Sequence, residues 1–174
     1  MAELPDLIDP SRHRDLGRRG GGPWGRRAAL VVLAALVGLG AANVFGQQPS
    51  DERAGAAAAS LELHAPSRLR DGLLFQARFT IVARRAIAEP TLVLDGGWFD
   101  RITVNTVVPE AKSQVALDGR VGLTFDRLPG GRRLVVWISF QVNPPGAGRR
   151  DQGVELRDGE ALIARIPRTV LIFP

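Results

Sequence analysis

The chain has 174 residues, 45% of them hydrophobic and 24% charged, and this length suits one ordinary domain. It contains no Cys, which excludes a disulfide, a thiolate zinc site, a thiolate-bound iron–sulfur cluster and a Cys nucleophile. The formal net charge is +5, and every Lys or Arg position except Lys112 is Arg, a bias typical of a high-GC bacterial genome.

The first 27 residues combine charge and glycine without an apolar period. Six Arg stand against four acidic residues, and the segment RRGGGPWG precedes a long apolar run. A segment of this composition cannot bury enough apolar surface to fold. We therefore expect residues 1–27 to form a disordered cytoplasmic tail.

Residues 28–46, AALVVLAALVGLGAANVFG, form one long apolar run without a charge. As a helix this run would measure roughly 28 Å, close to the hydrocarbon thickness of a bilayer. The Arg residues on its N-terminal side predict an N-terminus in the cytoplasm and a C-terminal part outside. Trp24 stands where an interfacial aromatic anchor would. We predict a transmembrane signal-anchor helix whose partner is the lipid bilayer.

Two other interpretations of this run remain open. It could be the core helix of a soluble protein, although such a helix seldom runs this long without a polar face. It could also be a cleaved secretory signal, cut near residues 39–42 or 56–59. The first cut lies inside the apolar run and the second lies far beyond it, which favours a retained helix.

The sequence after the apolar run changes from an irregular segment to a period of two. Residues 47–59, QQPSDERAGAAAA, show no alternation and predict a linker or a short helical stalk. From Ser60 onward, apolar residues alternate with polar ones and turn residues separate the segments. The expected strands are 60–64, 73–83, 91–95, 102–108, 113–117, 121–125, 134–142, 153–157, 161–166 and 169–173.

This density of short strands, in roughly 115 residues and with no convincing helix, is typical of a sandwich. We predict an all-β, immunoglobulin-like antiparallel sandwich over residues 60–174, lying outside the cytoplasmic membrane. The alternation places these residues in its core: Phe75, Phe79, Ile81, Val104, Leu123, Phe125, Val136, Ile138 and Phe140.

The long strand GLLFQARFTIVARR and the later segment LPGGRRLVVWISFQVNPPGAG resemble the late-strand pattern of bacterial immunoglobulin-like surface domains. The resemblance extends loosely over residues 60–174 and implies a sandwich displayed outside the membrane. The chain lacks both the paired Cys and the Tyr of a tyrosine corner, so no site of that family is transferred to it.

The residues that usually carry catalysis are sparse and scattered. The two His, His13 and His64, have no partners at ligand spacing, and many acidic residues of the outer segment fall at turns. We therefore expect no catalytic residue, no metal and no cofactor. The opposing hypothesis is an envelope hydrolase, which would need His64, carboxylates or Arg converging in a concave site.

Five residues are candidates for binding: Trp98, Phe99, Trp137, Arg132 and Arg133. Trp98 and Phe99 lie in the loop DGGWFD, where flexible Gly presents two adjacent aromatics. The favoured interpretation is that Trp98 folds back to plug one end of the sandwich. Trp137 lies on the face of its strand opposite the core row. If the opposing sheet covers both faces, Trp137 is a core residue, and if not, it contributes to an apolar patch.

These observations favour a non-enzymatic interaction domain tethered to the membrane. The preferred partner is another membrane or envelope protein, and a wall glycan stacked on Trp98 or Trp137 is the alternative. After residue 50, sixteen Arg and one Lys stand against fourteen acidic residues, which gives only +3. This small excess and the outward location argue against nucleic acid.

Overall fold

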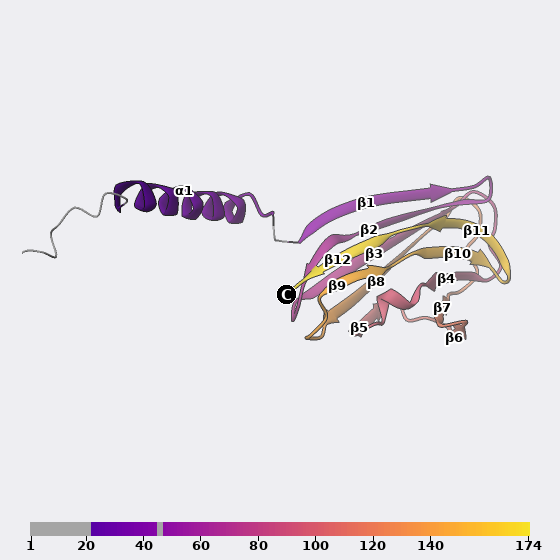
Figure 1. Ribbon diagram of the computed structural model, residues 1–174. Helices are drawn as coiled ribbons and strands as arrows, with labels where there is room; N and C mark the ends of the chain where they lie inside the picture. Colours follow the sequence, from indigo (N-terminus) through magenta and orange to yellow (C-terminus); the bar gives the residue numbers. More distant parts are fainter. Residues whose placement is uncertain (1–21, 45–46) are drawn as a thin grey trace, which may run out of the picture. The chain divides into compact units, whose positions relative to one another are not determined.

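The computed structural model describes residues 22–44 and 47–174, in two units (Figure 1). The first unit contains helix α1 (Gly22–Ala41), and the second contains the strands and the short 3-10 helix η2 (Gly96–Trp98). The strands are β1 (Gln48–Gly55), β2 (Ala59–Arg70), β3 (Leu74–Ala83), β4 (Pro90–Leu94), β5 (Ile102–Val108), β6 (Ser113–Leu117), β7 (Arg120–Thr124), β8 (Arg133–Val142), β9 (Gly148–Asp151), β10 (Val154–Asp158), β11 (Ala161–Ile166) and β12 (Thr169–Phe173).

Helix α1 contains most of the predicted apolar run. Its segment Trp24–Ala41 has 18 residues and a mean hydropathy of 1.4, which is long and apolar enough to cross a membrane. A signal sequence would meet the same two criteria. Taken by itself, the helix exposes apolar side chains such as Val31, at 68%, and Val37, at 64%.

The helix begins and ends earlier than the sequence predicted. It includes residues 22–27, which we expected to be disordered. Pro23 is compatible with the first turn, because the backbone N–H that proline lacks would have no hydrogen-bond partner within the helix there. The rest of the predicted tail, 1–21, and residues 45–46 of the predicted span lie outside the described residues. Two residues beyond the end of α1, Asn43 has a left-handed φ of 53°, which does not continue a right-handed helix. Asn tolerates this conformation better than most residues.

The strands form two sheets that pack into a sandwich, so the predicted fold class is confirmed (Figure 1). The seven-stranded sheet has the order β5-β8-β3-β2-β12-β9, with β1 also paired to β2, and the five-stranded sheet has the order β11-β10-β4-β7-β6. The pairs are antiparallel except that β12 runs parallel to β2.

Alternation along the central strands sets which face of the large sheet is buried. In β3 and β8 every second position turns inward and is apolar, and Phe79 and Phe140 at such positions are fully buried. The residues between them turn to the outer face of the same sheet. Eight of the nine predicted core residues are buried, which confirms them: Phe75, Phe79, Ile81, Leu123, Phe125, Val136, Ile138 and Phe140.

Val104 is the predicted core residue that the structure contradicts, because its side chain remains 36% exposed. It pairs with Phe140, so it lies on the inner face of the sheet as its period requires. However, β5 is the edge strand, and its register shifts between Val104 and Thr106. An inward position on an edge strand is therefore not covered as a central one is.

Strand β1 corrects the predicted linker, since residues 48–55 pair with β2 along their whole length. No apolar alternation marks this strand, because its partly buried positions include Ser50 and Glu52. Glu52 pairs with the buried guanidinium of Arg168, with 3.3 Å between Oε1 and Nε. Seven residue steps separate Ala41 from Gln48, which bounds the tether at about 25 Å when fully extended.

Candidate binding surface

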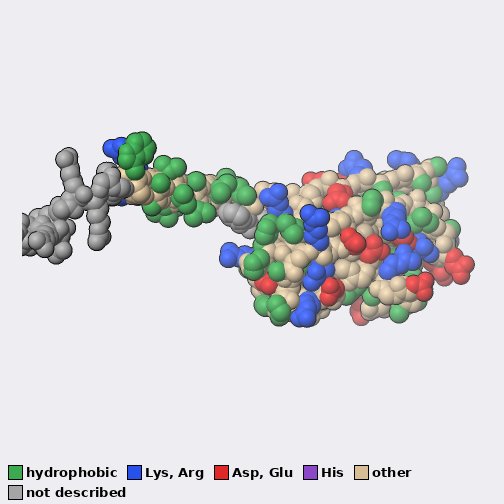
Figure 2. Space-filling model, in the orientation of Figure 1, with side chains coloured by type: hydrophobic (Ala, Val, Ile, Leu, Met, Phe, Trp, Pro, Cys, Tyr) green, Lys and Arg blue, Asp and Glu red, His purple; other side chains and the backbone are tan. Residues whose placement is uncertain are grey.

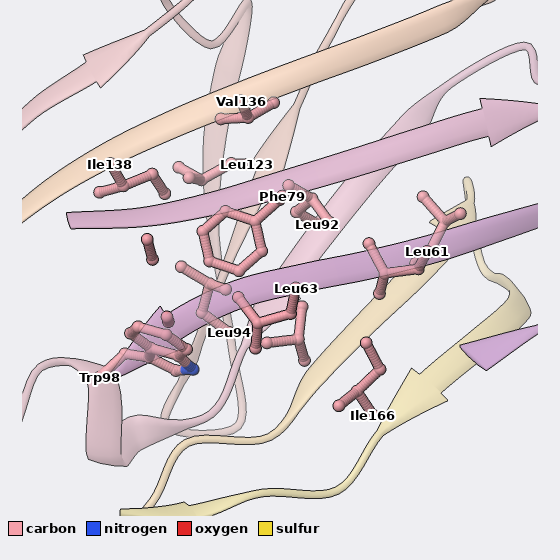
Figure 3. Packing of buried hydrophobic residues seen from close by; sticks show 14 of the residues in the cluster. Leu61, Leu63, Phe79, Leu92, Leu94, Trp98, Leu123, Val136, Ile138 and Ile166 are labelled. Atoms are coloured by element: carbon pink, nitrogen blue, oxygen red, sulfur yellow. The ribbon is translucent and has the colours of Figure 1, made fainter. Parts of the chain in front are cut away.

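Trp98 lies in the core, so the interpretation of it as a plug is confirmed and it offers no ring to a ligand. Its side chain is fully buried, and its Nε1 donates hydrogen bonds to the carbonyls of Gln152 (2.9 Å) and Gly153 (3.2 Å). Its ring centroid lies 5.1 Å from that of Phe140 and 5.7 Å from that of Phe79. Figure 3 shows Trp98 at one end of the labelled cluster, beside Leu94 and Leu63.

The loop around Trp98 is specified by close packing. A Cβ at Gly97 would overlap the backbone of Asp151, so a residue without a side chain lets η2 approach β9. Phe99, the second aromatic of the loop, is partly buried and packs against the core. The glycines of DGGWFD therefore serve packing, and neither aromatic is presented at a loop tip.

A buried cation lies beside Trp98. The Arg168 guanidinium carbon is 5.8 Å from the Trp98 ring centroid, and Arg168 donates to the carbonyls of Ala65 and Pro66. Burial lowers the pKa of Arg168 below its ordinary value, and the charge of Glu52 partly opposes that effect. The pair joins β1 to the body of the sandwich and is structural.

Trp137 lies on the opposite side of the large sheet, on its outer face, and its side chain is 37% exposed. It belongs to a row of paired residues that crosses five strands from β5 to β1. The row consists of Val108, Trp137, Arg78, His64 and Asp51. The Arg78 guanidinium lies over the indole, 5.3 Å from the ring centroid. The indole thus has a cationic neighbour in place of an apolar cover.

The outer face is hollowed next to Trp137, in a depression of about 400 Å³. The residues that line it come from β2, β3 and β8: Glu62, Arg78, Thr80, Val82, Arg133, Val135 and Trp137. We call this hollow the Trp137 depression. Its lining combines an aromatic ring, two aliphatic side chains, two cations, a carboxylate and a hydroxyl, a mixture suited to recognition of a partner.

The two predicted Arg residues separate in the structure. Arg133 lines the Trp137 depression, whereas Arg132 is exposed in the turn before β8 and does not line it. Sequence reasoning missed Arg78, Thr80 and Glu62 as members of the same site. The alternation in 73–83 already turned Arg78 and Thr80 outward, but only the strand register brings them beside Trp137.

His64 and Asp51 are hydrogen-bonded in the same row, with 2.6 Å between Nδ1 and Oδ1. Asp51 is 65% exposed and His64 is 37% exposed, so the pair lies on an open face. Among the described residues no hydrogen bond joins His64 to a hydroxyl, and no group of three His, Asp or Glu could hold a metal. The pair can orient an imidazole, but it has no described nucleophile to activate.

Comparisons with known proteins give no family for this chain. No family model matches the chain, and no curated protein matches it. Among solved structures, the chain is similar to the C-terminal domain of wzt, with a TM-score of 0.45 and 14% identity over 74% of this chain and 81% of that one. It is also similar to a non-cellulosomal cohesin from the hyperthermophilic archaeon Archaeoglobus fulgidus, with a TM-score of 0.35 and 15% identity over 63% of this chain and 88% of that one.

The fold defines a class of protein, a β-sandwich domain that follows an apolar helix. The two-sheet sandwich agrees with the fold that the resemblance to bacterial immunoglobulin-like surface domains implies. Its surface location stays a prediction.

Proposed function

We propose that this chain is a single-pass membrane protein whose sandwich is a non-enzymatic interaction module. In this proposal α1 crosses the cytoplasmic membrane with its N-terminus inside, as Arg26, Arg27 and the earlier Arg residues favour. The sandwich then lies outside, held near the bilayer by residues 42–47. A tether of this length favours partners in the same membrane or close to it, such as another subunit of an envelope assembly.

The observation that carries the proposal is the outer face of the seven-stranded sheet. Within the described part of the sandwich, this face keeps Trp137 and Val108 exposed, at 37% and 58%. Arg78 lies over the ring, and a second cation, Arg133, lines the same depression. Trp and Arg are the residues that most often dominate protein–protein contacts, and they do so where a partner excludes water from them.

A wall glycan is the second candidate, because the Trp137 depression also offers a ring, a carboxylate and a hydroxyl. A sugar would stack on the face of an indole, yet Arg78 already lies over the Trp137 ring. A glycan would have to displace that guanidinium, whereas a protein could place a carboxylate on it. The protein partner is therefore preferred.

Topology is tested by adding protease to intact spheroplasts that carry the full chain. We expect residues 60–174 to be degraded while the cytoplasmic tail survives. Full protection of residues 60–174 would contradict the orientation.

The binding surface is tested with single substitutions in the full chain, recovered from its own membrane after crosslinking. Trp137→Ala and Arg133→Gln should each reduce partner recovery several-fold, whereas Arg132→Gln, outside the depression, should not. Retention on isolated wall glycan, measured with the same variants, separates the second candidate. Unchanged recovery and retention with a folded domain would contradict this placement of the surface.

A further inference from the structure

A second surface of the sandwich lies at the end where β1 begins, and we call it the proximal end. Main-chain hydrogen bonds gather its loops: the Gly72 amide donates to Val142, and the Asp71 amide donates to Phe173. The proximal end thus contains the β2–β3 turn, the start of the β8–β9 loop and the end of β12. Figure 1 shows the chain entering β1 and β12 ending at this side of the sandwich.

Two exposed leucines stand at the proximal end. Leu73, in the turn, is 44% exposed, and Leu74, at the start of β3, is 62% exposed. Exposure of these adjacent leucines to water is unfavourable, and neither contributes to the core. Pro144 and Pro145, in the β8–β9 loop, are exposed as well. This end of the domain therefore presents apolar side chains.

Arginines lie on the strands that reach the same end of the sandwich. Arg70 is exposed at the end of β2, and Arg68 and Arg149 both pair in register with Leu171 of β12. Arg68, Arg149 and Leu171 line a hollow of about 390 Å³ together with Ser67, Thr169 and Val170, and none of these described residues carries a carboxylate. Figure 2 shows hydrophobic and basic side chains next to one another over this end of the sandwich.

Covalent geometry limits how far this surface can lie from the end of α1. Arg68 donates a hydrogen bond of 3.1 Å to the carbonyl of Val44, and Gln47 donates one of 3.0 Å to the carbonyl of Leu74. Val44 is three residues beyond Ala41, the last residue of α1, so covalent geometry limits that separation to about 11 Å. If α1 spans a bilayer, Arg68 and Leu74 must lie near its surface.

We propose that the proximal end docks on the lipid bilayer that α1 crosses. Leu73 and Leu74 enter the boundary between headgroups and hydrocarbon, and Arg68, Arg70 and Arg149 bind lipid phosphates. The inference rests on the proposed function, because it needs α1 in the membrane. Apolar residues beside cations are the combination that holds a surface on anionic lipid.

Docking of this end fixes the height of the Trp137 depression above the membrane. Leu74 and Arg78 lie on the same outer face of β3, four residues or about 13 Å apart along the strand. The depression then faces sideways, within reach of the outer parts of a membrane neighbour.

The absence of Cys allows a direct test with single spin labels in the full chain. Leu74→Cys reports the proximal end, and Leu162→Cys is its matched control, since Leu162 is also exposed (54%) but lies by the β10–β11 turn. Ala35→Cys reports the middle of α1. The chain is reconstituted in vesicles of phosphatidylcholine with phosphatidylglycerol at 7:3, and collisions with oxygen and with a water-soluble nickel chelate are compared.

We expect the ratio of oxygen to chelate collisions at residue 74 to be several-fold higher than at residue 162. It should fall in vesicles of pure phosphatidylcholine and in the Arg149→Gln variant, but not in Arg132→Gln. A label at 74 as open to the chelate as that at 162, with the label at 35 in lipid, overturns the docking and leaves the proposed function standing. A label at 35 that is open to the chelate overturns both. A lipid contact at 74 that ignores lipid charge and Arg149→Gln overturns the binding of lipid phosphate.

Discussion

Trp98 and Trp137 pack on opposite faces of the same sheet. Each has an Arg guanidinium near its ring, but they differ in burial and in hydrogen bonding. Trp98 is fully buried, both carbonyls near its Nε1 accept from it, and its ring packs on phenylalanines. Trp137 is 37% exposed and has the guanidinium of Arg78 over its ring. The first residue therefore stabilises the fold, and the second is available to a partner.

The largest effect expected from this comparison is on the stability of the sandwich when Trp98 is removed. Trp98→Ala leaves a cavity between the sheets and should lower the free energy of unfolding by about 3–5 kcal/mol. Chemical denaturation of the full chain in detergent, followed by circular dichroism, measures it. A loss as small as that of Trp137→Ala would contradict the assignment of Trp98 to the core.

The next effect concerns the ion pair that holds β1. Glu52→Gln leaves the buried Arg168 without its carboxylate and should cost about 2 kcal/mol. Amide exchange in β1 should become faster than in β3, because among the described strands β1 pairs only with β2, whereas β3 has a partner on each side. Asp51→Asn, on the exposed side of the same strand, is the control and should leave exchange in β1 nearly unchanged. Equal effects of the two substitutions would show that Glu52 has no special role.

Trp137→Ala should separate binding from stability. Because the side chain is partly exposed and outside the core, the free energy of unfolding should change by less than about 1 kcal/mol. Partner recovery from the membrane should nevertheless fall several-fold. A loss of stability equal to that of Trp98→Ala would mean that Trp137 is a structural residue.

The smallest effect is expected at Val104, the inward residue on the edge strand. Val104→Thr should change the free energy of unfolding by no more than about 0.5 kcal/mol, since the side chain is already 36% exposed. Val136→Thr, in the buried row of β8, should cost clearly more under the same denaturation assay. Equal costs would indicate that β5 is covered in solution.

The sequence was sufficient to predict the strands whose apolar residues alternate. The expected strand 102–108 agrees with β5 to the residue. It was not sufficient for β1 or β9, because QPSDERAG and GRRD contain almost no apolar residues. Glu52 turns toward Arg168, 116 residues later in the chain, and a local pattern cannot show such a pairing.

The candidate site was predictable only in part, for the same reason. Alternation placed Trp137 outside the core row, and the structure has it exposed. The neighbours Arg78, Thr80 and Glu62 reach it through the registers of β8 with β3 and of β3 with β2. Trp98 and Phe99 were candidates because Gly-rich loops often present aromatics, but here glycine serves the close approach of η2 to β9.

The most direct test of the central claim is site-specific photocrosslinking in the native membrane. A photoreactive residue replaces Val135, inside the Trp137 depression, or Leu162, outside it, in the full chain. We predict that one defined protein partner crosslinks from position 135 and not from 162, and that Trp137→Ala weakens this crosslink several-fold. The same products from both positions, or a crosslink from 135 that Trp137→Ala leaves unchanged in a folded domain, would contradict the account.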